Sequence, residues 1–242
     1  MRKLLIIAMV LTFAVTADAQ WFDDFDAYPS NTLLDGQGGW VSWAGYADVT
    51  SLASNDIAAS PENSAKIMQG SDIVQEFAGV TSGQWEVTML QYVPTASLNS
   101  GDSYFIMLNK YDGPNNDFNW SIQLKADTNN GLMVHDWPGP GTTKPLITNR
   151  WVELKLEIDL DIDLCRTWYD GQVLGVQQWT AAGGTNVQSA IEAIDLYSGQ
   201  TEGNRPVYYD DMLLDVGSFQ IPEPSIFLLG GLGLLALIRR KK

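Results

Sequence analysis

Residue types that could carry out chemistry are few and scattered along this chain. His135 is the only histidine. Its neighbour Asp136 would point to the opposite face of a strand, so the two side chains could not work as a pair. The sequence contains neither the Gly-x-Ser-x-Gly turn of serine hydrolases nor the His-Glu-x-x-His helix of zinc proteases. The sequence therefore predicts a protein without catalytic residues.

One group of carboxylates has a spacing that is typical of calcium loops. Asp159, Asp161, Asp163 and Asp170 occupy positions 1, 3, 5 and 12 of an EF-hand pattern, but position 6, which needs glycine, is Leu164. Carboxylates on the same face of a strand lie about 6.6 Å apart at Cα, so chelation would require the chain to bend. These four residues are therefore interpreted as a solvated acidic face and turn.

Aromatic side chains are stronger candidates for binding. The segment between residues 20 and 221 has nine tryptophans, and aromatic rings stack on sugar faces through apolar area while a polar rim holds hydroxyl groups. Trp40, Trp43, Trp120 and Trp137 lie in or beside expected loops, where binding groups concentrate. We expect these four residues to contact a ligand. The alternative is that each packs in or at the rim of the core.

The elements that must position these groups are strands. In Trp151–Leu160 apolar residues alternate with charged ones over ten positions, which is typical of a strand with one buried and one solvated face. Asp170 and Gly171 then form the dipeptide that a tight hairpin turn favours. The next strand, Gln172–Trp179, would pair back. The core is therefore expected to be an antiparallel sheet with a charged outer face.

Further short strands are expected along the whole segment, separated by Gly, Pro, Asn and Asp turns. They are Trp21–Asp26, Val41–Trp43, Val49–Leu52, Ala65–Met68, Ile73–Phe77, Gln84–Val93, Ser103–Asn109, Phe118–Lys125, Gly131–His135, Ile191–Tyr197 and Val207–Val216. No long amphipathic helical pattern occurs between residues 20 and 221. The fold class is therefore all-β, an antiparallel β-sandwich or jelly roll.

The two ends of the chain have the patterns of export signals. Residues 1–19 combine a basic start, an apolar stretch and the small-x-small sequence Ala17-Asp-Ala19, which predicts a cleaved signal peptide; a membrane anchor is the alternative. Residues 222–242 join Pro222-Glu223-Pro224 to an apolar stretch, 226–238, and a basic end that includes Arg239 and Arg240. Residues 20–221 are left as one domain.

The C-terminal pattern resembles the PEP-CTERM sorting signal. Its 13 apolar residues span only about 20 Å as a helix, short of the roughly 30 Å hydrocarbon core, and its cations would stay cytoplasmic. The resemblance implies transient anchoring of 226–238 in the inner membrane, recognition by an exosortase-type enzyme, removal of the tail, and delivery to the cell envelope or extracellular matrix. The alternative is an ordinary short anchor.

The net charge limits the possible binding partners, and the cysteine content limits the possible disulfides. Eight basic and 27 acidic residues fall between residues 20 and 221, so the net charge of that segment is near −19. Such a surface repels nucleic acid, and no nucleic-acid partner is expected. Cys165 is the only cysteine, so the chain can form no internal disulfide, and a buried, inert thiol is expected.

The predicted domain also resembles a fold family. The run from Trp151 through Asp159 and Trp168 to Gly171, with the acidic strand Tyr208–Asp215, is similar to laminin-G/concanavalin-A-like jelly rolls. The resemblance covers most of 21–217 and implies a habit of glycan binding, with an extracellular polysaccharide as partner. Glu157-Ile-Asp159 is similar to the Glu-x-Asp-x-x-Glu strand of jelly-roll glycosidases, but Ile162 replaces the last glutamate.

The same resemblance implies neighbouring terminal strands and a structural calcium ion. Acids of the first strand (Asp23, Asp24 and Asp26) and of the last (Asp210, Asp211 and Asp215) would then lie together. Hard oxygen ligands without a histidine or cysteine cluster favour Ca²⁺ over zinc. Asp24, Asp26 and Asp211 are the predicted ligands. The alternative is exposed strand acids.

These observations lead to one expectation and two alternatives. We expect an exported, exosortase-sorted surface or matrix protein that binds a glycan without chemistry. The first alternative is a structural matrix protein whose aromatic residues all belong to the core. The second is a divergent glycoside hydrolase or lyase.

Overall fold

The computed structural model describes residues 21–219 except 140, 182, 184–186 and 202–204. The predicted signal peptide (1–19) and the sorting segment (222–242), with its apolar stretch 226–238, lie outside the described residues. Over the described range no helix is long and apolar enough to cross a membrane.

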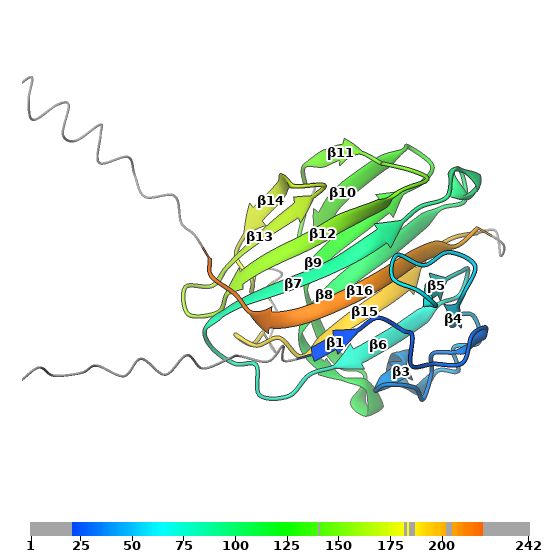
Figure 1. The fold of residues 1–242 in the computed structure, drawn as a ribbon. Coiled ribbons are helices and arrows are strands. Elements are labelled where there is room, and N and C mark those ends of the chain that lie inside the picture. The colour runs from blue at the N-terminus through cyan, green and yellow to red at the C-terminus, as the bar shows by residue number, and fades with distance from the viewer. Residues whose placement is uncertain (1–20, 140, 182, 184–186, 202–204, 220–242) are drawn as a thin grey trace, which may run out of the picture.

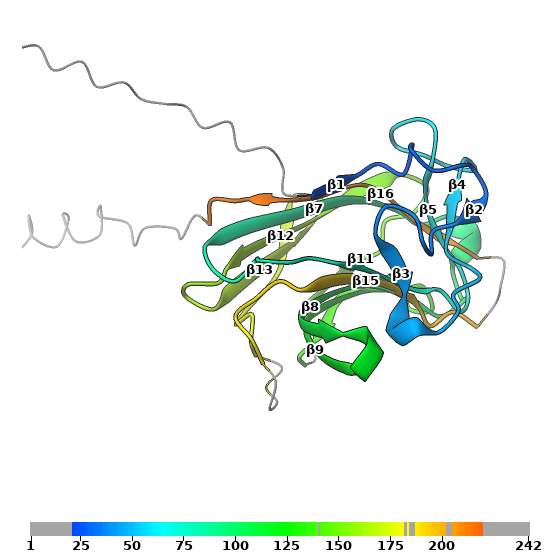
Figure 2. The same ribbon diagram turned by 90° about the horizontal axis from the view of Figure 1, so that it is seen from below.

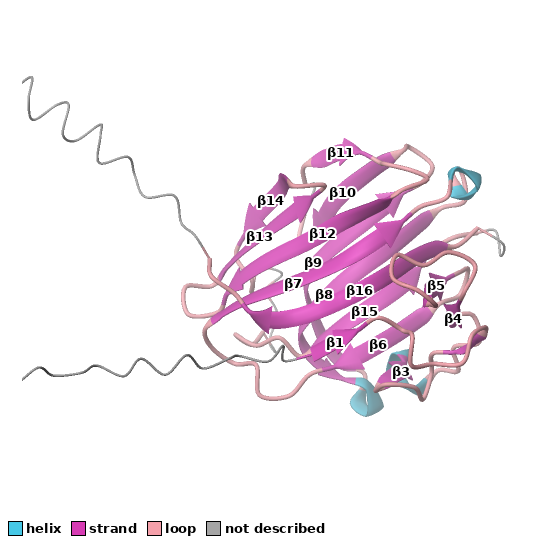
Figure 3. Cartoon of the chain, in the orientation of Figure 1, coloured by secondary structure: helices cyan, strands magenta, loops and turns pink. Residues whose placement is uncertain are grey.

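The chain forms two antiparallel sheets that lie face to face (Figures 1 and 2). Strands dominate the described residues, and helical structure there is confined to three short 3₁₀ turns (Figure 3): η1 (Trp43–Gly45), η2 (Thr95–Ser97) and η3 (Gly113–Asn115). The prediction of an all-β sandwich is therefore confirmed.

The first sheet, called here the β7 sheet, has the order β14-β13-β12-β7-β16-β5-β4-β2, and β1 pairs with β16. Its strands are β1 (Trp21–Asp23), β2 (Thr32–Leu33), β4 (Leu52–Ser54), β5 (Ser64–Ile67), β7 (Gln84–Tyr92), β12 (Trp151–Asp159), β13 (Leu164–Tyr169), β14 (Gln172–Gln177) and β16 (Val207–Val216). The pairing of Phe22 with Leu213 confirms that the first and last strands are neighbours.

The second sheet, the β8 sheet, has the order β11-β10-β9-β8-β15-β6-β3. Its strands are β3 (Trp40–Ser42), β6 (Asp72–Glu76), β8 (Asp102–Asp112), β9 (Asp117–Asp127), β10 (Leu132–Trp137), β11 (Thr143–Pro145) and β15 (Ala193–Ser198). Residues far apart in sequence therefore meet at its centre, because β15 pairs with both β6 and β8.

The hairpin expected from the sequence is present. β12 buries alternate residues, and its partner β13 turns into β14 at Asp170 and Gly171. Both turn residues have positive φ, 51° and 69°. A two-residue hairpin turn requires positive φ at both positions when its twist matches the twist of the flanking strands. The alternation and the turn dipeptide thus fix this corner of the β7 sheet locally.

The inner faces of the two sheets form one core. Met89 and Leu156 from the β7 sheet and Phe105 and Leu124 from the β8 sheet are among its buried members. Burying a side chain of this size contributes about 1.5–3 kcal/mol. Cys165 also lies in this core, so the expected burial of the cysteine is confirmed, and burial raises the pKa of its thiol.

A second apolar cluster covers the opposite face of the β8 sheet. It contains Trp43, Val74, Ile106, Leu108, Tyr111 and Ala193, and Tyr104, Phe118 and Trp120 pack against it. Because successive side chains of a strand point to opposite faces, β6, β8 and β15 supply residues to both clusters. The outer face of this sheet is therefore apolar at its centre rather than uniformly charged.

Several segments differ from the sequence prediction: for example, the first strand ends at Asp23 rather than Asp26, and Trp137 is the last residue of β10 rather than part of a loop. The strand expected at Val49–Leu52 begins instead at Leu52, because the carboxylate of Asp48 accepts hydrogen bonds from the backbone N–H groups of Thr50 and Ser51, at 2.7 and 2.9 Å, and shapes a turn. Trp43 belongs to η1 rather than to a strand.

Candidate functional site: an aromatic and acidic cleft on the β8 sheet

A cavity of about 500 Å³ opens on the outer face of the β8 sheet, within the size range of ligand sites. We call it the outer cleft. It is lined by η1, β6, β8, β9, β10 and β15 through Trp43, Asp72, Tyr104, Ile106, Phe118, Trp120, Gln123, Asp136, Trp137, Asp195 and Tyr197. Five strands and a turn thus position its residues, so the site depends on the tertiary fold.

Four aromatic rings form a row along the cleft. The ring centroids of Trp43 and Phe118 are 4.9 Å apart, those of Phe118 and Trp120 are 5.4 Å apart, and those of Trp120 and Trp137 are 6.0 Å apart. The Trp120 and Trp137 rings are nearly perpendicular, at 88°. Such edge-to-face contacts stabilise aromatic pairs beyond their buried area. The row is therefore a packed apolar wall.

Two carboxyl groups lie at the base of the cleft on neighbouring strands. Asp195 of β15 is only 3% exposed. Burial raises the pKa of Asp195 well above its usual value, and the neighbouring charge of Asp72 raises it further. Burial also raises the pKa of Asp72, to about 6, and the charge of Asp48 raises it further. Both carboxyl groups are therefore harder to ionise than exposed acids.

Several polar atoms of the cleft lack partners. Of nine buried side-chain N or O atoms without a hydrogen-bond partner among the described residues, four belong to cleft residues: Oδ1 of Asp72 and of Asp195, and Nε1 of Trp120 and of Trp137. Each such atom costs about 1–3 kcal/mol, and most buried polar atoms in proteins are paired. A site that gathers two donors and two acceptors of this kind is suited to receive a polar ligand or ordered water.

The charge at the cleft is negative. No Lys, Arg or His is among its lining residues in the described part of the chain. The nearest ion pairs involve Lys125 of β9, whose Nζ lies 3.4 Å from Asp136 Oδ1 and 3.9 Å from Asp102 Oδ2. The hydroxyl of Tyr104 donates to Asp102 Oδ2 at 3.2 Å, and burial raises the pKa of Tyr104. The local cation is therefore already engaged by carboxylates.

The structure brings three of the four predicted tryptophans together. Trp43, Trp120 and Trp137 all line the outer cleft. Trp40 does not, and its prediction as a ligand contact is wrong. Its side chain is 0% exposed in the core between the sheets, and Nε1 donates to Asp23 Oδ2 at 2.8 Å. The glycine-rich sequence before Trp40 led us to expect a loop, but β3 directs this ring inward.

Sequence reasoning missed the carboxyl pair of Asp72 and Asp195. A usable signal was present in the last part of the chain, since Asp195 interrupts the apolar run of Ile194 and Leu196. A charged residue in a strand that is otherwise buried is a functional candidate, because burial without a partner is costly. Its partner Asp72 lies more than a hundred residues earlier and becomes a neighbour only through the pairing of β6 with β15.

His135 faces the opposite side of β10 from Asp136, as the sequence predicted. It lines a separate cavity of about 350 Å³. Its Nδ1 lies 2.9 Å from Thr167 Oγ1 and its Nε2 lies 2.6 Å from Gln177 Oε1. Burial lowers the pKa of His135. A neutral ring thus joins β10 to β13 and β14, which closes one edge of the sandwich.

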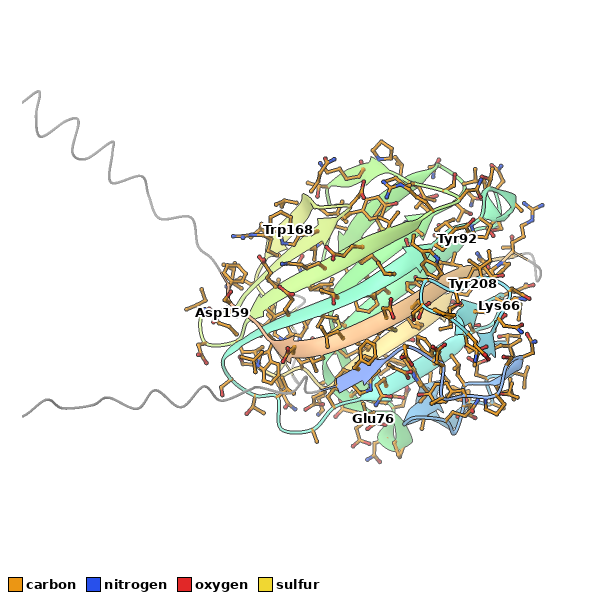
Figure 4. All side chains as sticks on the ribbon, in the orientation of Figure 1. Lys66, Glu76, Tyr92, Asp159, Trp168 and Tyr208 are labelled. Carbon is orange, nitrogen blue, oxygen red and sulfur yellow. The ribbon has the colours of Figure 1, made fainter. Side chains whose placement is uncertain are left out.

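The glycosidase-like pair lies on the other sheet. Glu157 of β12 forms ion pairs with Lys155 and Arg166, each at 3.2 Å. Asp159, at the end of β12 (Figure 4), accepts a hydrogen bond from Gln84 Nε2 at 2.7 Å and from the backbone N–H groups of the turn that follows. Neither residue lines the outer cleft. The contacts of Glu157 and Asp159 stabilise the β7 sheet and the turn that follows β12.

Two of the three predicted calcium ligands, Asp26 and Asp211, lie beside one loop. Asp26 Oδ1 accepts hydrogen bonds from the backbone N–H groups of Glu62 and Asn63, the latter at 2.8 Å. Asp211 Oδ1 accepts a hydrogen bond from Ser60 Oγ at 2.8 Å. Within the described residues no group of three or more His, Cys, Asp or Glu side chains is arranged to hold a metal. The calcium site, including Asp24, therefore stays a prediction.

Comparison with known proteins identifies the tail and the fold. Residues 220–242 match the family described as the PEP-CTERM protein-sorting motif. This motif marks a protein that is exported and processed at the cell surface by an exosortase-type system. The comparison with curated protein sequences gave no match.

Similar solved structures are jelly rolls of low sequence identity. The cellulose induced protein Cip1 superposes with a TM-score of 0.56 at 15% identity, over 84% of this chain and all of that one. An endo-β-1,4-glucuronan lyase from the fungus Trichoderma reesei gives 0.54 at 12% identity, over 83% and 96%. An alginate lyase in complex with an alginate tetrasaccharide gives 0.53 at 12% identity, over 83% and 98%. These likenesses establish the fold alone.

Proposed function

We propose that this exported surface protein binds an extracellular polysaccharide in the outer cleft without altering it. The observation that carries the proposal is the meeting, in one cavity, of a row of aromatic rings with four polar atoms that lack partners. Sugars present apolar ring faces and hydroxyl groups, which match such a combination.

A hydrolase that uses Asp72 and Asp195 is the alternative that a specific observation favours, because buried carboxyl groups with shifted pKa values mark many active sites. Glycosidases separate their two carboxyl groups by about 5–5.5 Å when they retain the configuration of the sugar and by about 6.5–9.5 Å when they invert it. Asp72 and Asp195 lie on the same face of paired strands, where Asp72 is opposite Tyr197 and Asp195 is opposite Val74. The row of aromatic rings beside this pair supports binding, and activity screening on β-glucans tests hydrolysis.

A lyase would need different groups. Elimination from a uronate requires a base and a positive group that stabilises the charge developing on the substrate carboxylate. Tyr104 is a poor base here, because burial raises its pKa. Lys125 is held between Asp102 and Asp136. The cleft is therefore better suited to hold a sugar than to cleave one.

A glycan array separates binding from a purely structural role. The protein spanning residues 20–221 should retain at least one polysaccharide, and Trp120→Ala/Trp137→Ala should weaken that binding by at least tenfold in Kd. Trp151→Ala is the matched control, because Trp151 packs against Tyr92 on the β7 sheet, with centroids 5.4 Å apart. It should bind as the native chain does. Absence of binding to every glycan, or equal loss in both variants, would contradict the proposal.

A further inference from the structure

The distribution of charge around the outer cleft restricts the sugars that it can take. Three carboxyl side chains line it: Asp72, Asp136 and Asp195. No basic side chain of the described residues does. Across the same part of the chain, six basic side chains have Nζ or guanidinium nitrogens within 4 Å of a carboxylate oxygen: Lys66, Lys110, Lys125, Arg150, Lys155 and Arg166. An anionic sugar would therefore meet carboxylates and no available cation.

The buried acceptor at the base of the cleft gives the second argument. Asp195 is only 3% exposed, and its Oδ1 has no hydrogen-bond partner among the described residues. Oδ1 of Asp72 is also without a partner there. A carboxylate brought to this place would add a third acceptor, because ionised carboxylates cannot donate. An ammonium group carries three donors and forms the stronger, charge-assisted hydrogen bonds with carboxylates.

We propose, on the basis of the proposed function of this cleft, that it selects glycans with a protonated amino group, such as deacetylated hexosamines, and rejects polyuronates. The ammonium group would donate to Oδ1 of Asp72 and Asp195, while the row from Trp43 to Trp137 covers the sugar faces. The choice is opposite in charge to the glucuronan and alginate named for two proteins of similar fold.

Binding of three oligosaccharides of equal length to the full-length chain tests the inference: an oligomer of glucosamine, its N-acetylated form and a uronate oligomer. Titration at about pH 6 keeps the amine protonated, since that pH lies below the usual pKa of an amine. Salt is held near 0.15 M, where long-range attraction between exposed charges is largely screened. The glucosamine oligomer should bind at least tenfold more tightly than the N-acetylated one, and the uronate oligomer should bind most weakly.

Two variants of cleft residues and one control variant place the selectivity in the cleft. Asp72→Asn/Asp195→Asn should bring the glucosamine and N-acetylated oligomers to within about threefold of each other, and Glu153→Gln, a change at an exposed residue of β12, should leave the preference intact. Asp136→Asn removes an ion-pair partner of Lys125 and should strengthen uronate binding by several fold. Asp136 is half-buried, so Asp136→Asn still tests the inference if circular dichroism shows that the double variant does not fold.

Tight uronate binding, or an unchanged preference in both the double variant and Asp136→Asn, would overturn this inference while leaving glycan binding itself in place. Failure of all three oligomers and of the glycan array would overturn the inference and the proposed function together.

Discussion

At the scale of single residues, the carboxyl pair is the most unusual feature of the described chain. Asp72 and Asp195 occupy the same face of two paired strands, and the burial of both groups opposes their ionisation. Like charges on neighbouring strands are destabilising unless something offsets them. Protonation of one carboxyl group would offset this repulsion in the free protein, and a ligand cation would do so in the complex.

This pair predicts a specific dependence of stability on pH. Both pKa values are raised above 3.8, so the folded chain keeps protons that the unfolded chain has lost. The stability they confer is full below about pH 4 and is lost as pH rises through about 6. We expect the pair to reduce the free energy of unfolding by on the order of 1–2 kcal/mol between about pH 4.5 and pH 7.5.

Urea unfolding at the two pH values checks this expectation. Asp195→Asn should make the pH dependence shallower, because the amide group that replaces the carboxyl group cannot ionise and would donate to Asp72. Glu153→Gln should keep the native slope. Parallel pH profiles for the native chain and Asp195→Asn would show that the two carboxyl groups do not titrate as a coupled buried pair.

Calcium is a second prediction at the residue scale. Asp26 and Asp211 both hold the loop at Ser60–Asn63, where a divalent cation would relieve repulsion between terminal-strand acids. Millimolar Ca²⁺ should raise the melting temperature, since binding only to the folded state stabilises by about 2.7 kcal/mol at a hundredfold excess over Kd. Mg²⁺ at matched ionic strength should do less, because it demands stricter geometry. Asp24→Asn/Asp211→Asn should remove the difference between the melting temperatures in Ca²⁺ and in Mg²⁺. If both metals shift the melting temperature equally in every variant, these residues are exposed strand acids and not calcium ligands.

At the scale of elements, short sequence patterns predicted the strands that pair with their neighbours in the sequence. The alternation of β12 and the dipeptide at Asp170 and Gly171 are sufficient for the hairpin. Trp40 and Trp43 are only three residues apart, yet the first ring enters the core and the second lines the cleft. Which face of a short strand is buried depends on the partner sheet, and a glycine-rich sequence carries no signal for that choice.

The hairpin turn offers a matched pair of glycine substitutions. Gly171 has a φ of 69°, and a Cβ added there would have no heavy atom within 4 Å, so Gly171→Ala meets backbone strain and no clash. We expect a loss of about 1–2 kcal/mol in the free energy of unfolding. Gly139 has the same open space without a positive φ, and Gly139→Ala should be neutral or slightly stabilising. Equal effects in urea unfolding would contradict the turn assignment.

At the scale of the whole molecule, the sandwich is complete before the sorting segment begins. β16 ends at Val216, and the backbone N–H of Phe219 donates to Gln84 Oε1 at 3.0 Å. Tyr92 and Tyr208 cover the outer face of the β7 sheet beside Lys66 (Figure 4), on the sheet that does not form the cleft. The β-sandwich and the outer cleft are therefore formed by residues 21–219.

Removal of residues 222–242 should accordingly release a soluble protein with the melting temperature of the full domain. The expected change is below about 1 kcal/mol, since substitutions away from core contacts seldom exceed that value. Scanning calorimetry of residues 20–221 and of the full-length chain in detergent checks it. Aggregation or loss of the cooperative transition in the shorter chain would make the tail part of the folded domain.

The sequence could predict the class and the tail, because periodicity and terminal motifs are local properties. Three of the four tryptophans that it singled out line the cleft, but Trp120 and Trp137 lie in β9 and β10 rather than in loops. The sequence could not predict the cleft itself. Asp72 and Asp195 become neighbours through the pairing of β6 with β15, and the row of rings requires η1, β9 and β10 at once. Such contacts across the sheet follow from topology, which no short stretch of residues encodes.

The most direct test of the central claim observes the tryptophan indole N–H groups during glycan binding. With ¹⁵N-labelled tryptophan, the nine indole signals can be followed by NMR as a glycan from the array is added, and Trp→Ala variants assign them. Ligand binding in the outer cleft predicts that the signals of Trp120 and Trp137, whose Nε1 atoms have no partner among the described residues, shift most, while the core signals of Trp40 and Trp179 stay in place. Shifts centred on Trp151 or Trp168, with Trp120 and Trp137 unmoved, would contradict the account.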